Sequence, residues 1–186
     1  SSDPTDPERF FVGLQDNGTV ERRAGSGTVW RHLVGGDGGW TQMNARDPNE
    51  MFGESQGTGN LSRSINGGLS FGGVGGGLTG RNCFLPPYVI SPDLAWRMLY
   101  ATERVWVSTD RGLSFVALSP DLTSGGAASI RTLAIAPSNP LYVYAATNDG
   151  RVLASSDGGV SFALSISGHP GWPRVTREIF VCPNDP

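Results

Sequence analysis

Apolar residues alternate with polar ones along short stretches of the chain, and turn-forming residues separate these stretches. The pattern is clearest around residues 129–166, in the runs IRTLAIA, LYVYAAT, RVLASS and SFALSI. β-branched and aromatic residues are frequent in these runs, and none of them has the spacing of an amphipathic helix. The pattern predicts four short antiparallel strands in this region.

One turn sequence occurs four times along the chain. It reads SSDGGVSF at 155–162, STDRGLSF at 108–115, SINGGLSF at 64–71 and, less regularly, RAGSGTVW at 23–30. The shared frame is Ser-x-Asp-x-Gly-x-x-aromatic, and successive copies of its glycine are 41, 44 and 47 residues apart. A repeat of this length is typical of solenoids, propellers and arrays.

A second turn, rich in proline and aspartate or asparagine, keeps the same period. Its copies begin at Asp3, Ala45, Ser91, Ala136 and Cys182. Four short strands in about 45 residues are the unit of a β-propeller blade. The sequence therefore predicts an all-β fold, a β-propeller or propeller segment of about four four-stranded antiparallel blades.

The repeated turn is predicted to be structural. An aspartate in such a hairpin accepts hydrogen bonds from backbone N–H groups two residues on, and the glycine takes a positive φ. The aromatic residue is expected to anchor the next strand against the neighbouring blade. The structural residues predicted in this way are Ser64, Asn66, Gly68, Phe71, Ser108, Asp110, Gly112, Phe115, Ser155, Asp157, Gly159 and Phe162.

A chain of 186 residues is long enough for one domain. We expect a single propeller domain or segment over 1–186, with repeat units at 1–40, 41–80, 81–128 and 129–172 and a last strand within 173–186. That strand, TREIFVCP, would close a four-bladed ring or begin a further blade. Three arrangements stay open: a closed four-bladed ring, a segment of a longer ring that additional blades complete, and a ring completed by self-association.

Charge and composition exclude several partners and cofactors. The formal net charge is −3 and 17% of residues are charged, so no basic surface recommends a nucleic acid. No apolar run approaches the roughly 18 residues of a membrane span, and the chain as given carries no signal peptide. Cys83 and Cys182 lie in apolar stretches and are expected to be buried free thiols, with a disulfide or a metal pair as the alternative. No group of residues has metal-ligand spacing, so neither a metal nor another cofactor is expected.

The repeated turns resemble the Asp-box, or BNR, repeats of sialidase-like, sortilin-like and xyloglucanase-like propellers. The resemblance covers nearly the whole chain: two copies match fully, one has Asn66 for aspartate, and the first keeps only the Gly-x-x-Trp half. The stretches GLQDNGT and GGDGGW also resemble large secreted bacterial BNR-repeat proteins labelled as glycosyl hydrolases. The resemblance implies a propeller and an extracellular or periplasmic location.

Blade topology predicts which loops carry a ligand site. Because strands alternate in direction, loops between blades and loops between second and third strands share one face. Carboxylates, amides and tryptophans there would suit a sugar. The predicted ligand-binding residues are Asp16, Asn17, Trp40, Gln56, Arg81, Arg104, Asn148, His169 and Trp172.

Three functions follow from these residues and the resemblance. The preferred one is a non-catalytic scaffold or binding module that presents its loop face to a glycan or a protein. The second is part of a xyloglucanase-like glycoside hydrolase, with Asp37 paired with Glu54 or Asp149 as acid and base. The third, a sialidase, is disfavoured, because its family pattern needs three arginines around a sugar carboxylate and no such triad is visible in the motifs.

Overall fold

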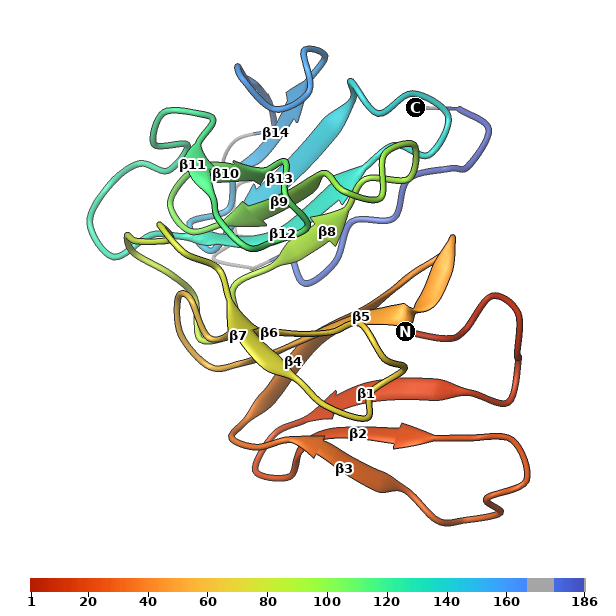
Figure 1. The fold of residues 1–186 in the computed structure, drawn as a ribbon. Helices are drawn as coiled ribbons and strands as arrows, with labels where there is room; N and C mark the ends of the chain where they lie inside the picture. The colour runs from red at the N-terminus through yellow and green to blue at the C-terminus, as the bar shows by residue number, and fades with distance from the viewer. Residues whose placement is uncertain (167–175, 186) are drawn as a thin grey trace.

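The structure, a computed structural model, describes residues 1–166 and 176–185. These residues form fifteen strands and no helix, arranged as four antiparallel sheets (Figure 1). We number the sheets as blades 1 to 4. Blade 1 contains β1 (Phe10–Leu14), β2 (Gly18–Arg22) and β3 (Arg31–Val34); blade 2 contains β4 (Gly38–Asn44), β5 (Asp47–Ser55), β6 (Leu61–Ser64) and β7 (Gly72–Val74); blade 3 contains β8 (Tyr88–Ile90), β9 (Met98–Ala101), β10 (Val105–Ser108) and β11 (Val116–Ala117); blade 4 contains β12 (Ile130–Ile135), β13 (Val143–Thr147), β14 (Val152–Ser155) and β15 (Ala163–Ile166).

Each blade is a simple meander in which every strand pairs with the next one along the chain. Blades 2, 3 and 4 have four strands, and blade 1 has three. The all-β architecture with one turn-rich unit per blade is the one that the repeat predicted.

The repeated turn has the same hydrogen bonds in blades 2, 3 and 4. In blade 3 the Ser108 hydroxyl donates to Asp110 Oδ1 (2.7 Å) and accepts the N–H of Gly112 (2.8 Å). Asp110 Oδ1 accepts the N–H of Ser114 (2.9 Å). The matching sets are Ser64, Asn66, Gly68 and Ser70 in blade 2 and Ser155, Asp157, Gly159 and Ser161 in blade 4.

These bonds differ in one respect from the expected ones. The Asp110 N–H, two residues after Ser108, points to the serine hydroxyl at 3.3 Å, while the carboxylate takes the N–H four residues after itself. Serine therefore closes the first part of the turn and aspartate the second.

The aromatic residue that ends each turn packs against the preceding blade. Phe71 joins Phe11 of blade 1, with ring centroids 6.1 Å apart, and Phe115 meets Tyr100 in the core between blades 2 and 3. Phe162 packs against the core between blades 3 and 4, which includes Leu99. Three hydrophobic cores thus join successive blades.

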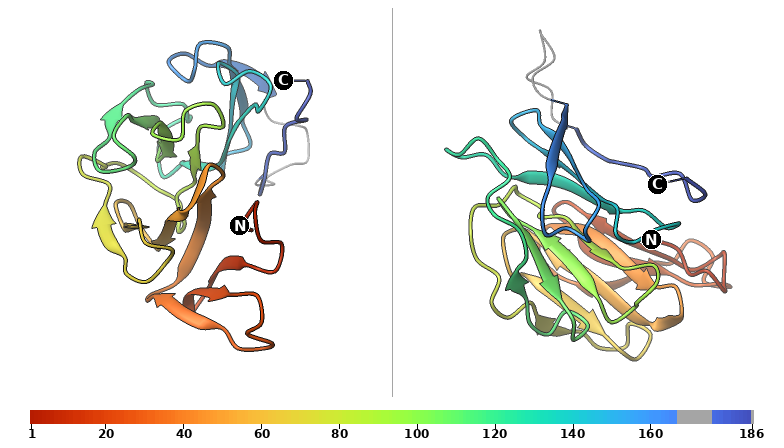
Figure 2. Two further views of the ribbon diagram at one scale, coloured as in Figure 1. Left: turned by 45° about the vertical axis from the view of Figure 1, so that its right-hand side comes forward. Right: turned by 90° about the horizontal axis from the view of Figure 1, so that it is seen from above.

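The four blades form an open arc. Within the described residues, no hydrophobic core joins blade 1 to blade 4. Figure 2 shows the blades fanned around one centre, with the N-terminus and the segment 176–185 on the open side.

The N-terminal residues lie along the inner edge of blade 1. The Ser1 amino group donates to the carbonyl of Phe11, and the Phe11 N–H donates to the Ser1 carbonyl, both at 2.9 Å. Ser2 forms an isolated antiparallel bridge with Phe10. In the other blades a complete inner strand occupies this edge.

Three expectations about the chain differ from the structure. Residues 176–185 contain no strand, so the described part of TREIFVCP closes no sheet; Ser1 and Ser2 already pair with one end of the β1 edge. Cys182 is exposed, whereas Cys83 is buried as expected, because the segment around Cys182 packs into no sheet. The expected end of the first unit, residue 40, lies inside β4.

Candidate binding site

A pocket of about 920 Å³ lies at the centre of the arc, where the inner strands converge. Its wall combines the edge of β1, most of β4, the segment before β8, and one residue of β12. Two residues of the 176–185 segment complete it. The described lining residues are Ser1, Val12, Gly13, Gln15, Gly38, Gly39, Trp40, Thr41, Gln42, Met43, Phe84, Leu85, Arg131, Arg177 and Glu178.

Side chains of β4 connect it to blade 3. Trp40 Nε1 donates to the carbonyl of Leu85 at 3.3 Å. The Gln42 amide donates to the Tyr88 carbonyl (3.0 Å) and accepts the N–H of Ile90 (2.8 Å). The neighbouring inner strands β4 and β8 belong to different sheets and are not paired with each other. The Gln42 side chain bonds to the backbone of β8 instead, and this holds the pocket wall in place.

Glycines let blade 1 and blade 2 approach each other closely beside the pocket. A Cβ placed on Gly13 would lie 2.0 Å from the carbonyl oxygen of Gly39, and one on Gly38 would lie 2.1 Å from that of Gly18. Contacts this short exclude any side chain at these positions. The glycines of GGDGGW thus make this part of the wall from bare backbone.

The charged groups of the pocket come from two segments. Arg131 projects from β12 and is half-buried, while Arg177 and Glu178 are exposed on the segment 176–185. Within the described residues, the Arg131 guanidinium has no hydrogen-bond acceptor or ion-pair partner. The pocket wall thus carries two guanidinium groups, those of Arg131 and Arg177, and one carboxylate, that of Glu178. This excess of positive charge favours a ligand that carries an anionic or strongly polar group.

Glu54 lies behind the pocket wall. Its Oε1 accepts the Trp40 N–H at 3.3 Å, and a Cβ on Gly39 would be 2.8 Å from the same oxygen. The carboxyl is fully buried, and within the described residues its Oε2 has no partner. Burial raises the pKa of Glu54 well above its ordinary value, and the Trp40 N–H offsets only part of this.

Tyrosine and cysteine side chains surround this acid. The Tyr88 hydroxyl lies 2.7 Å from the Phe52 carbonyl and 3.0 Å from that of Trp40. Burial raises the pKa of the Cys83 thiol to about 11, and the thiol lies 2.9 Å from the carbonyl of Leu85. Neither group is poised to act as a nucleophile at neutral pH.

The three candidate catalytic carboxylates lie outside the described lining of the central pocket. Asp37 Oδ1 accepts the N–H of Asp16 (2.7 Å), while Asp149 Oδ2 accepts that of Ser124 (3.0 Å) in blade 4. Glu54 is enclosed as described above.

Four of the nine predicted ligand residues connect one loop to another: Asp16, Gln56, Arg81 and Asn148. Gln56 Oε1 accepts the N–H of Asp37 (3.0 Å), and Asn148 Oδ1 accepts that of Ser129 (3.0 Å). In blade 3, Glu103 accepts the N–H of Arg81 (2.7 Å) and the guanidinium of Arg104 (3.0 Å).

In blades 2, 3 and 4, the loop after the second strand thus holds the connection that enters the same blade. Asn17 is exposed and donates to the carbonyl of Gln15 (3.1 Å). Of the predicted ligand residues that the structure describes, Trp40 lines the pocket; His169 and Trp172 lie outside the described residues.

Sequence reasoning missed Arg131, Gln42 and Phe84 as lining residues. Arg131 had a signal, because it is a single charge within the apolar run IRTLAIA. Gln42 and Phe84 had none, since nothing local reveals which residues of an inner strand meet another blade.

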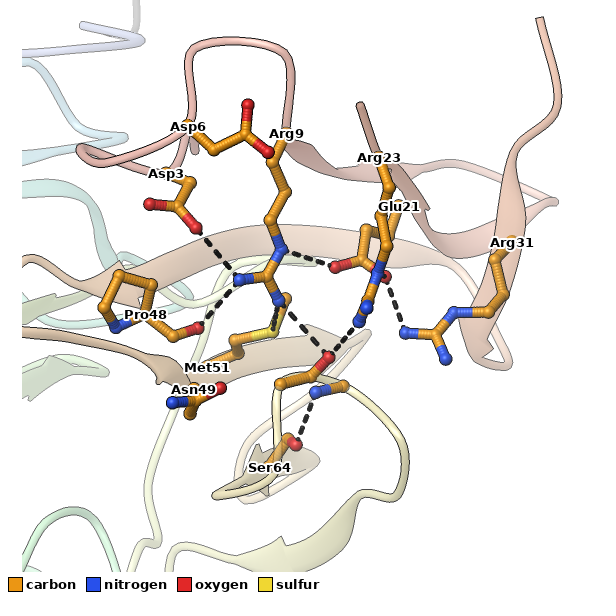
Figure 3. Close-up of polar contacts among 12 residues, drawn as sticks. Asp3, Asp6, Arg9, Glu21, Arg23, Arg31, Pro48, Asn49, Met51 and Ser64 are labelled. Atoms are coloured by element: carbon orange, nitrogen blue, oxygen red, sulfur yellow. Dashed lines mark hydrogen bonds and ion pairs between the residues drawn. The ribbon is translucent and has the colours of Figure 1, made fainter. Parts of the chain in front are cut away.

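A triad of arginines does exist, although the motifs did not reveal it. Arg9, Arg23 and Arg31 surround the carboxylate of Glu21 at 2.8, 2.9 and 2.6 Å (Figure 3). Glu21 is buried, and burial alone would raise its pKa, but the hydrogen bonds from the three arginines hold the pKa below its ordinary value. Because all three arginines already bind the carboxylate of Glu21, they do not form an open site for the carboxylate of a ligand.

The triad also joins two blades. Arg9 Nη2 donates to the carbonyl of Gly67 in blade 2 at 3.2 Å, and Arg23 donates to the same oxygen. Arg9 also pairs with Asp3 at 3.0 Å. The cluster is therefore an inter-blade connection.

The described residues contain neither a group of metal ligands nor a helix that could cross a membrane. No three histidine, cysteine, aspartate or glutamate residues there are grouped as a metal site requires. No helix there is long and apolar enough to cross a membrane.

Comparison with known proteins identifies the fold. No known family matches the chain, and no curated protein does. The GH74 xyloglucanase from Xanthomonas campestris is similar over 89% of this chain and 29% of its own, with a TM-score of 0.71 and 16% identity. YCF48 from Cyanidioschyzon merolae is similar over 100% of this chain and 59% of its own, with a TM-score of 0.67 and 14% identity.

A structure of YCF48 bound to D1 peptide is also similar, with a TM-score of 0.59 and 15% identity over 91% of this chain and 53% of that one. The chain thus spans less than a third of the xyloglucanase and just over half of YCF48. At these identities the likeness shows the fold alone, which is that of a β-propeller.

Proposed function

We propose that this chain is a non-catalytic β-propeller binding module whose central pocket takes part of a glycan or of a protein partner. The observation that carries the proposal is the pocket itself. Trp40 and Phe84 supply aromatic surface, Gln15 supplies an amide, and Arg131 supplies a cation that is unpaired within the described residues. Such a mixture of apolar surface and a few convergent polar groups is typical of binding sites.

A binding role fits the placement of the acids better than hydrolysis does. Asp37 and Asp149 each accept backbone N–H groups, and Glu54 is enclosed without access to the pocket. The xyloglucanase-like hydrolase with paired carboxylates therefore stands as the alternative outcome of the test below. The peptide-bound YCF48 structure supports a protein partner by analogy of fold only.

The family and location belong to the same proposal. We propose that the repeated turns are Asp-boxes of the BNR type, which their shared serine and aspartate hydrogen bonds support. An extracellular or periplasmic location follows from that resemblance, and fractionation of the source cells with an antibody against the chain tests it.

The test measures binding of plant and bacterial polysaccharides and of acidic peptides by calorimetry. Arg131→Gln and Phe84→Ala should each weaken binding of the ligand at least tenfold, because both side chains line the pocket. Arg46→Gln is the matched control: Arg46 is exposed in the turn between β4 and β5, outside the described pocket wall, and its loss should leave affinity unchanged.

Two results would overturn the proposal. Equal binding by wild type and Arg131→Gln would show that the ligand binds outside this pocket. Release of new reducing ends from a polysaccharide by wild type, but not by Asp37→Asn, would show that the chain is a glycoside hydrolase and not a non-catalytic binding module.

A further inference from the structure

The segment before β8 fixes the aromatic part of the pocket wall. Trp40 Nε1 donates to the Leu85 carbonyl at 3.3 Å, and the Gly57 N–H donates to the Phe84 carbonyl at 3.0 Å. Trp40 and Gly57 both belong to blade 2, so this blade holds the segment from two sides. The side chains of Trp40 and Phe84 are therefore held in place before a ligand arrives, which lowers the cost of binding.

Arg131 brings a positive charge to the same segment. It is half-buried on β12 and has no ion-pair partner within the described residues. Burial raises the pKa of the Cys83 thiol, and the charge of Arg131 offsets part of this rise, as a cation near the thiol does. Cys83 directly precedes Phe84 in the chain. The pocket wall thus carries a cation and an exposed aromatic side chain close to one short segment.

The charge of the pocket wall suits one carboxylate. The side chains of Arg131 and Arg177, set against that of Glu178, leave a surplus of one positive charge among the described lining residues. A carboxylate carries one negative charge, and its two oxygens accept hydrogen bonds from both arms of a planar guanidinium. A phosphate monoester carries about −1.5 to −2 charges at pH 7, which exceeds this surplus.

The uncharged part of the wall suits a sugar ring better than a peptide. Phe84 is 50% exposed, so its ring offers an apolar surface on which the C–H groups of a sugar can pack. Sugar hydroxyls that meet no protein partner stay hydrated in an open pocket. A peptide backbone instead needs an acceptor for each N–H group that the pocket buries. Among the side chains of the described lining, Gln42 already accepts the Ile90 N–H, so few acceptors remain for a peptide.

We propose that the pocket binds a uronic acid residue of an acidic polysaccharide. The carboxylate of the sugar lies on the guanidinium of Arg131, and the sugar ring packs on Phe84 beside Trp40. This inference rests on the proposed function, because it names the ligand of the same pocket. The three residues come from β12, from the connection between blades 2 and 3, and from β4.

The test measures binding of polygalacturonate, alginate and hyaluronan by calorimetry, each beside the same polymer with its carboxyl groups reduced to hydroxyls. At least one acidic polymer should bind at least about tenfold more tightly than its reduced form, which lacks the charged acceptor for Arg131. Dextran sulfate tests for capture of any polyanion. The proposal would be overturned if an acidic polymer bound no more tightly than its reduced form, or no more tightly than dextran sulfate.

Two pocket variants separate the carboxylate from the sugar ring. Arg131→Gln should weaken binding of the acidic polymer at least about tenfold and leave the weaker binding of the reduced form unchanged. Phe84→Ala should weaken both, because both forms have the same ring. Arg46→Gln, outside the described wall, is the matched control and should change neither. With all variants folded by far-UV circular dichroism, equal effects of Arg131→Gln on both forms would contradict the proposal.

Further outcomes distinguish the failure of this inference from the failure of the proposed function. Binding of neutral polysaccharides alone, or of poly-glutamate alone, that Phe84→Ala weakens would overturn the uronate ligand and leave the binding module in place. Absence of binding to every polysaccharide and peptide tested would overturn both.

Discussion

Arg111 Nη1 lies 3.9 Å from Glu50 Oε1, across the interface between blades 2 and 3. At the interface between blades 3 and 4, the position of Glu50 is taken by Arg97, which donates to the carbonyl of Gly158 at 2.7 Å. Gly158 occupies the position of Arg111 in its own turn. Equivalent positions thus join both pairs of blades. Between blades 3 and 4 the earlier blade supplies an arginine and the later blade a glycine carbonyl. Between blades 2 and 3 the earlier blade supplies a glutamate and the later blade the arginine.

The Arg111 position tests the cost of that exchange. Arg111 has a φ of +61°, while the equivalent glycines, Gly67 and Gly158, have +66° and +80°. Arg111→Gly relieves this strain, worth about 1 kcal/mol, and loses a surface charge pair worth at most about 1 kcal/mol. Arg111→Ala loses the pair and keeps the strain. We expect Arg111→Gly to be more stable than Arg111→Ala by about 1 kcal/mol in urea unfolding; equal stabilities would contradict this account.

Glu21 should be the acid whose loss most weakens the contact between blades 1 and 2. Glu21→Gln leaves three arginines without their buried counter-charge, and breaking a buried pair of this kind costs about 3–5 kcal/mol. Urea unfolding measures the loss. Glu8→Gln is the control, because Glu8 is exposed and makes no ion pair within the described residues; an equally small effect of both changes would show that the cluster adds little stability.

Gly13 should tolerate no side chain. Gly13→Ala places a methyl group 2.0 Å from the Gly39 carbonyl oxygen, so blades 1 and 2 must separate, at an expected cost of at least about 2 kcal/mol. Gly72→Ala is the matched control in β7, where nothing lies within 4 Å of the added Cβ. Thermal melts of both variants measure the difference, and a melting temperature for Gly13→Ala equal to that of Gly72→Ala would refute the close approach.

Glu54 should make the protein less stable as the pH rises. Burial raises its pKa above the ordinary value of 4.5, so the folded state keeps a proton that the unfolded chain releases. Its contribution is therefore full below that value and falls by up to about 1.4 kcal/mol per pH unit above it, until the folded pKa is reached.

Glu54→Gln removes this dependence and isolates it from carboxylates that behave oppositely, such as Asp110 and Asp149, whose pKa values are lowered. We expect the stability of Glu54→Gln relative to wild type to increase between pH 5 and pH 8. A difference that stays constant over this range would mean that Glu54 is ionised in the folded protein.

The candidate site was harder to predict than the fold. Trp40 was expected at the ligand face and lines the pocket, yet Asp37, Gln56 and Asn148 were expected beside it and instead hold loop backbones. Loop carboxylates and amides look alike in sequence whether they meet a ligand or a backbone N–H, because both uses need the same acceptor.

The blades of this protein can be predicted from the sequence alone, because the turn Ser-x-Asp-x-Gly-x-x-aromatic encodes its own hydrogen bonds within eight residues, as Ser108 to Phe115 show. Alternation of apolar residues then determined which face of each strand is buried. The fold, and not any local pattern, brings Arg131 and Trp40 to one pocket and makes Arg9, Arg23 and Arg31 converge on Glu21. Those relationships depend on how the blades are placed around the centre, and blade placement arises from packing between residues far apart in the chain.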